Sequence, residues 1–245
     1  MSHMHIPDGV LPLWLVFAGW IITFGVLSFC IMKVKNIKLE QKLPLIGIVS
    51  ALMIVGMTLE IVPIAYHVNL SVIAGIVLGP SLAFIAVFIV DLIVAMFGHG
   101  GITVVGLNNL IVGAEATLGF YLFRVFWGIL SNDRLSVGLS SALATVFSLI
   151  LSSSLMIGIV YMSEASPERI LYKNERSSDE KILSHGLFER QEKHLVRDKK
   201  IDIERFAKTV FFLGLFGWTL ESVITGFVIG YVFRVRPDLI LSKVI

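Results

Sequence analysis

The 245-residue chain is 56% hydrophobic and 16% charged, and its mean hydropathy is +0.87. Soluble domains are roughly 45–50% apolar and about 25% charged, so this composition excludes an ordinary soluble domain and indicates an integral membrane protein. A net charge of +2, without a basic patch interleaved with aromatic residues, excludes nucleic acid as a partner. The single cysteine, Cys30, lies in an apolar run and cannot form an internal disulfide.

The chain begins with a nitrogen-rich segment that contains His3 and His5 close to the amine of Met1. An amine, imidazoles and deprotonated backbone amides form a flat all-nitrogen set, which favours Ni(II) or Cu(II) over Mg, Ca or tetrahedral Zn. The competing interpretation is a frayed terminus, and Ser2-His3-Met4 also resembles an expression remnant. Asp8 and Gly9 indicate a turn, although Asp8 could instead orient a ligating histidine.

Seven apolar segments follow in chain order, and we expect them to form one all-α transmembrane domain over residues 1–245. A span needs roughly 20 apolar residues, so a long run after Asn69 must be broken at Gly79-Pro80, where proline ends the helical hydrogen-bond ladder. The first segment is as long as a full span and lacks a basic leader, so we expect it to be retained. The segments are Leu13–Met32, 44–61, 69–79, 80–97, Thr103–Phe126, Ser136–Met162 and Lys208–Phe233.

The stretch 163–207 differs from the rest, with ten acidic and ten basic side chains and no apolar stripe. We interpret it as a charged extramembrane insertion, either a solvated loop or amphipathic helices, with regulation or partner docking as the alternative. Short loops rich in lysine and arginine lie on the cytoplasmic side. Three basic loops (Lys33–Lys42, Arg124–Arg134 and Arg234–Arg236) therefore predict an external amino terminus.

The same alternation places His3, His5, His67 and His99 on the outer side. Neutral imidazole is the commonest metal ligand, so this grouping favours an external metal site. For His67 the alternative is a loop histidine bonded to backbone. For His99, between glycines, a hydrogen-bonding role is favoured over ligation.

Carboxylates also occur in the apolar segments, at Asp91, Glu115 and Glu221, with Glu60 near an outer edge. Intramembrane carboxylates are costly and face the bundle interior or water. We favour structural roles for them over proton or metal relays.

Small residues at four-residue spacing permit close helix approach, either within the chain or to another subunit. These stripes are Ala144/Ser148/Ser152, Ser71/Gly75/Gly79 and Gly47/Ala51. The chain has no phosphate-binding G-x-x-x-x-G-K-[ST] loop, so it is not the ATPase of a pump.

Several motifs together resemble the NikM/CbiM substrate-binding subunits of energy-coupling-factor transporters for nickel and cobalt. The resemblance covers residues 4–162 and 208–240, and 163–207 is not part of it. The matching motifs are Met4-His5-Ile6-Pro7-Asp8-Gly9, His67 twelve residues before Gly79-Pro80, Phe97–Thr103 with Gly106 and Asn108, Leu220-Glu221-Ser222, and Arg234–Asp238.

The resemblance implies a multi-pass prokaryotic cell-membrane subunit of seven helices, a six-helix core with an added first helix. Its substrate would be Ni(II), with Co(II) as the alternative, and the His-Ile-Pro-Asp-Gly motif favours nickel. The implied partners are ATPase subunits and a transmembrane coupling subunit, with a small accessory membrane subunit as a further candidate. The implied ligands are Met4, His5 and His67.

Three residues precede Met4, so its nitrogen is an amide and not an amine. Either the family geometry is broken, or Met1-Ser2-His3 supplies an amine–amide–amide–imidazole chelate in its place. Loss of Met1 would instead leave Ser2-His3 at the terminus, which restores the terminal X-His pattern. The candidate ligands are therefore Met1, His3, His5 and His67. Two other classes stay open: an autonomous ion-coupled carrier using Asp91, Glu115 and Glu221, and a membrane metalloenzyme with an open coordination site.

Overall fold

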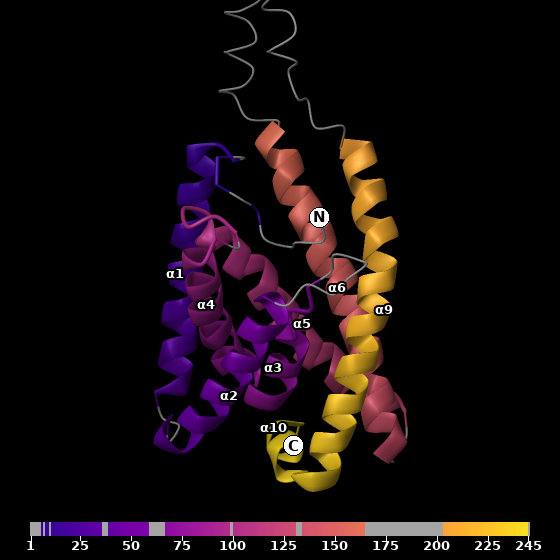
Figure 1. Cartoon of the computed structure of the whole chain (residues 1–245). Coiled ribbons are helices and arrows are strands. Elements are labelled where there is room, and N and C mark those ends of the chain that lie inside the picture. The colour runs from indigo at the N-terminus through magenta and orange to yellow at the C-terminus, as the bar shows by residue number, and fades with distance from the viewer. Residues whose placement is uncertain are drawn as a thin grey trace, which may run out of the picture.

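A computed structural model describes residues 6, 8–9, 11–35, 39–58, 67–98, 100–130, 134–164 and 203–244, and the regular elements within these ranges are all α-helices (Figure 1). The bounds are α1 Leu13–Val34, α2 Leu39–Thr58, α3 Ser71–Leu78, α4 Pro80–Met96, α5 Val105–Ile129, α6 Arg134–Glu164, α9 Ile203–Val235 and α10 Asp238–Val244. The expected all-α class is confirmed.

Four of these helices contain stretches long and apolar enough to cross a bilayer, and they are Leu13–Val34, Val105–Ile129, Leu135–Ser163 and Val210–Val235. Their outward faces are apolar: on α1, for example, Phe17 is 66% exposed and Ile21 is 72% exposed. Contiguous exposed apolar surface of this kind fits hydrocarbon and not water. The protein is therefore a multi-pass membrane protein.

Each of the seven expected apolar segments contains a helix, but the count of seven membrane spans stays a prediction. The eight residues of α3 extend for only about 12 Å, against a hydrocarbon core of about 30 Å. The apolar stretches of the second and fourth helices, Lys42–Thr58 and Pro80–Met96, are also shorter than a usual span. Length alone thus separates these three helices from the four long ones.

Several boundaries differ from the sequence-based expectation. Helix α9 begins at Ile203, five residues before the expected Lys208 and inside the stretch expected to be a charged insertion. The second helix begins at Leu39, so Pro44 lies inside it at the sixth position instead of opening it, at the cost of one backbone hydrogen bond. The third helix begins at Ser71, two residues later than expected, after the irregular segment 67–70. The short α10 was not expected.

Helix α5 lies at the centre of the bundle and packs against α1, α3, α4 and α6, while α6 pairs with α9 (Figure 1). Helix α3 is buried along its whole length. The predicted small-residue stripe explains how it approaches α5 so closely, since any side chain on Gly75 would collide with the backbone of Ala116. This stripe therefore serves packing within the chain.

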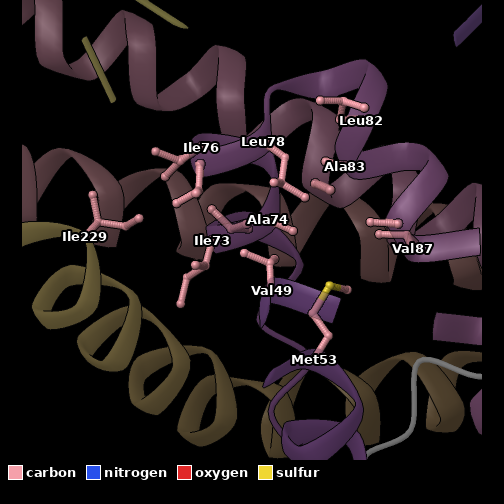
Figure 2. Packing of buried hydrophobic residues seen from close by; sticks show 14 of the residues in the cluster. Val49, Met53, Ile73, Ala74, Ile76, Leu78, Leu82, Ala83, Val87 and Ile229 are labelled. Carbon is pink, nitrogen blue, oxygen red and sulfur yellow. The ribbon is translucent and has the colours of Figure 1, made fainter. Parts of the chain in front are cut away.

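Figure 2 shows the apolar core that surrounds α3, with side chains from α2, α4 and α9 converging on it. Met53 of α2 and Val87 of α4 are fully buried, and Ile229 of α9 closes the other side. Ile240 of α10 belongs to the same cluster, and α10 packs against α3. The core fixes α3, and with it the segment 67–70 that leads into α3.

Candidate metal centre

The described part of the amino-terminal segment is bound to the bundle through Ile6. The Ile6 amide donates to Oδ1 of Asn108 at 2.8 Å, and Nδ2 of Asn108 donates back to the Ile6 carbonyl at 3.2 Å. The Gly101 amide donates to the same carbonyl at 3.2 Å. The Ile6 side chain is buried in an apolar cluster with Ile111 and Met156. Ile6 is therefore anchored on the bundle, whereas the frayed-tail alternative for His3 and His5 falls on residues outside the described ones.

Asp8 joins this segment to the loop before α5. Its carboxylate accepts hydrogen bonds from the Ile102 amide at 3.0 Å, the Thr103 amide at 2.9 Å and the Thr103 hydroxyl. The Thr103 hydroxyl bond is the main cause that lowers the pKa of Asp8, and the backbone amide bonds act in the same direction. A side chain on Gly101 would lie 2.5 Å from the Asp8 backbone nitrogen, so the approach requires glycine. The turn predicted at Asp8 and Gly9 is present.

His67 begins a second segment, residues 67–70, which leads into α3. His67 is half-buried, and Val68 and Asn69 are buried. A side chain on Gly56 of α2 would lie 2.5 Å from the Val68 carbonyl, so α2 packs directly against this backbone. The segment is thus built into the core.

Three polar contacts hold the residues that follow His67. Oδ1 of Asn69 accepts from the Ser71 amide at 2.7 Å, which satisfies a donor at the start of α3. The Leu70 amide donates to Oε1 of Glu221 on α9 at 3.1 Å. The Ser71 hydroxyl forms a very short hydrogen bond with Glu115.

Glu115 links three helices, which agrees with the structural role favoured from the sequence. Besides Ser71 of α3, its carboxylate accepts from the Ser152 hydroxyl of α6 at 2.9 Å. Glu115 and Glu221 are each at least 99% buried, as is Asp91 on α4. Buried carboxylates of this kind need hydrogen-bonding partners, and for Glu115 serines of the α3 and α6 stripes supply them.

The two segments meet the same face of α5. Asn108, which holds Ile6, and Glu115, which holds Ser71, are seven residues apart and so lie on one helical face, about 10 Å apart along the axis. Glu115 lies ten residues into α5, about 15 Å from its amino-terminal end. A polar centre therefore lies between α3, α5, α6 and α9, well inside the bundle.

The predicted ligands divide into two groups. His67 is placed as above, whereas Met1, His3, His5 and the family-register Met4 lie outside the described residues, as do His99 and Glu60. Within the described ranges, no three His, Cys, Asp or Glu side chains are grouped closely enough to hold a metal. The ligand set thus stays a prediction.

Sequence reasoning did not assign roles to Asn69 and Asn108. Asn69, shortly before an apolar helix, carries a readable helix-start signal. Asn108 offers no such local signal, because its partner Ile6 is 102 residues away in sequence.

The long apolar helices and the buried polar centre define a multi-pass α-helical membrane protein with an internal polar site. Two solved structures are similar in fold. One, described as a transition metal transporter, has a TM-score of 0.66 and 20% identity, covering 98% of this chain and 96% of the other. A truncated transition metal transporter has a TM-score of 0.65 at 19% identity, covering 94% and 98%.

The model of the CbiM family, described as the cobalt uptake substrate-specific transmembrane region, matches residues 5–239, and the chain belongs to this family. A putative metal transport protein of Haloquadratum walsbyi is 27% identical over 71% of this chain and 97% of its own length. A putative cobalt transport protein CbiM of Methanosphaerula palustris is 28% identical over 61% and 68%. A putative fused nickel transport protein NikMN of Archaeoglobus fulgidus is 34% identical over 49% and 42%.

Proposed function

We propose that this protein captures Ni(II), or alternatively Co(II), from outside a prokaryotic cell for ATP-driven import by an energy-coupling-factor transporter. The observation that carries the proposal is the anchoring of Ile6 on the face of α5 that also receives the segment following His67. Membership of a cobalt-uptake family supports a metal substrate. Relatives named for cobalt and for nickel transport support these two ions.

Chain length is compatible with a shared site. The two anchor points on α5 are about 10 Å apart along the axis. An extended chain covers up to about 3.5 Å per residue, so the five residues before Ile6 can span up to about 17 Å. A terminal amine five residues before Ile6 could therefore span the distance between the two anchor points, which is compatible with a site shared with His67.

The proposed coordination is planar and made of nitrogen. In one register His5, the Met4 nitrogen and His67 bind the ion. In the other, Met1-Ser2-His3 supplies an amine–amide–amide–imidazole chelate, and His5 or His67 competes for an edge of it or approaches axially. Planar nitrogen donors suit Ni(II). Ligands must lose protons to bind, so affinity should fall as the pH drops through about 6.5, the ordinary histidine pKa.

The proposed partners are ATPase subunits and a transmembrane coupling subunit, with a small accessory membrane subunit as a further candidate. The chain itself carries no phosphate-binding loop motif. In the proposed topology the chain crosses the membrane seven times, with the amino terminus outside and the basic loops inside.

The test is calorimetry of the purified protein with Ni(II) and Co(II), followed by uptake in cells with and without co-expressed ATPase and coupling subunits. We expect tight binding by the chain alone and uptake only with the partners. No binding of either ion would refute metal capture. Uptake by the chain alone that stops when the proton gradient is collapsed would favour the ion-coupled carrier.

A further inference from the structure

The segment that carries His67 contains a strained residue, Leu70. Its backbone has φ 56° and ψ 18°, which is left-handed, and it is the one non-glycine residue with positive φ in the part of the chain that the structure describes. A bulky side chain in this conformation is strained and persists only where surrounding contacts impose it. Such strain is typical of binding and switch segments.

Glu221 supplies the contact that holds this conformation. Its Oε1 accepts the Leu70 amide at 3.1 Å, although the two residues are 151 positions apart. Glu221 is 99% buried on α9, and its hydrogen bond with the half-buried Leu70 is partly shielded from water. An amide left unpaired here would retain the desolvation penalty of a buried donor.

The neighbouring contacts leave Leu70 as the point where the segment changes direction. On one side, the Asn69 side chain and α3 fix Ser71, and the Leu70 carbonyl begins the helix by accepting the Ala74 amide at 3.2 Å. On the other side, the Val68 backbone lies against Gly56. A change of the Leu70 dihedral angles would therefore redirect the chain that leads back to His67.

We propose that Glu221 is a positioning residue for metal capture: by holding Leu70 in the left-handed conformation, it sets the direction from which His67 approaches the metal. This inference rests on the proposed function, because it takes His67 as a ligand. Glu221 acts here through the backbone, as a hydrogen-bond acceptor, and does not touch the ion. It also connects the metal segment to α9.

The test compares Ni(II) affinity in full-length Glu221→Leu and Glu221→Gln proteins. Leucine removes the acceptor, so we expect affinity to fall about tenfold or more. Glutamine keeps a carbonyl oxygen, so we expect affinity within about threefold of the natural protein. Ser222→Ala is the matched control, because Ser222 is buried on the same helix turn and bonds only to the Thr219 carbonyl among the contacts described. Equal losses in the leucine and glutamine variants would overturn the proposal in favour of a charge-dependent role, such as ligation or proton transfer.

A substitution cycle isolates the backbone effect. Glycine adopts the left-handed conformation without steric cost. The loss of Ni(II) affinity caused by Glu221→Leu should therefore be at least about threefold smaller in a Leu70→Gly background. An undiminished loss would overturn the role in holding Leu70. If Glu221→Leu does not fold, Leu70→Val against Leu70→Gly tests whether metal affinity depends on the left-handed conformation at position 70, because a β-branched residue is strongly disfavoured at positive φ. The valine variant should bind more weakly than the glycine variant, and equal affinities would refute the proposal.

Amide hydrogen exchange of residues 67–71 in the metal-free protein separates this proposal from the proposed function. We expect faster exchange in Glu221→Leu and unchanged exchange in Ser222→Ala. If the natural protein binds no nickel but exchange follows this pattern, metal capture fails and the positioning contact stands. If the natural protein binds nickel and neither affinity nor exchange responds to Glu221→Leu, the positioning role fails.

Discussion

Replacing Asn108 with alanine should release the amino-terminal segment from the bundle. Asn108 makes two reciprocal hydrogen bonds with the Ile6 backbone, at 2.8 Å and 3.2 Å. The Ile6 carbonyl keeps a second donor in the Gly101 amide, but the Ile6 amide has no other bond among those described. The main effect is thus a buried donor left unsatisfied.

The magnitude follows from that donor. An unsatisfied buried amide costs about 1–3 kcal/mol. The burial of the Ile6 side chain stabilises the docked segment by a similar amount, about 1.5–3 kcal/mol. The substitution therefore offsets much of the docking energy, and the undocked population should rise about 5- to 150-fold.

Two measurements check this prediction. Hydrogen exchange at the Ile6 amide should accelerate by that factor, and Ni(II) affinity should fall in parallel if the segment carries ligands. Asn109→Ala is the matched control, because Asn109 is an equally buried neighbour whose amide makes no hydrogen bond with the described residues. Unchanged Ile6 exchange in Asn108→Ala, or an equal change in Asn109→Ala, would refute the anchoring role.

Three further outcomes are expected. Asp8→Ala should speed amide exchange of the 100–103 loop, because it lowers the free energy of loop opening by less than about 1 kcal/mol, a small amount since Asp8 is exposed. The folded pKa of Asp8 is lowered, so this difference from the natural protein should be full above the unfolded pKa of about 3.9 and vanish as the pH falls through the folded pKa. Gly101→Ala should displace the segment and weaken nickel binding about tenfold by forcing the Asp8 contact apart, whereas Gly25→Ala, with open space around it, should bind normally, as calorimetry can check. Cysteine labelling from outside intact cells should reach position 99 but not position 38, and labelling at 38 would contradict the proposed orientation.

The helices were largely predictable from sequence because apolar length is a local property. The Leu13–Val34, Val105–Ile129 and Arg134–Glu164 helices lie within a few residues of the expected segments. The break at Gly79-Pro80 predicted a short third helix at 69–79, but apolar length could not place its start at Ser71, since Asn69 and Leu70 shape that start through their own side-chain and backbone contacts.

The polar centre was predictable only in part. Its buried carboxylates were visible as unusual residues in apolar runs, and a structural role for Glu115 was favoured. Their partners were not visible, because Glu221 meets Leu70 across 151 residues and Asn108 meets Ile6 across 102. Such pairings depend on how α5 and α9 pack, and no local pattern encodes them.

X-ray absorption spectroscopy of the Ni(II)-loaded protein tests the central claim most directly, with His67→Ala, His5→Ala and His3→Ala beside the natural chain. We predict the spectrum of a planar, all-nitrogen site, with one nitrogen donor lost in His67→Ala. A donor should also be lost in either His5→Ala or His3→Ala, and which of the two loses it identifies the register. A spectrum and an affinity unchanged by His67→Ala would contradict the account, because the segment that Leu70 and Glu221 position would then not carry a ligand.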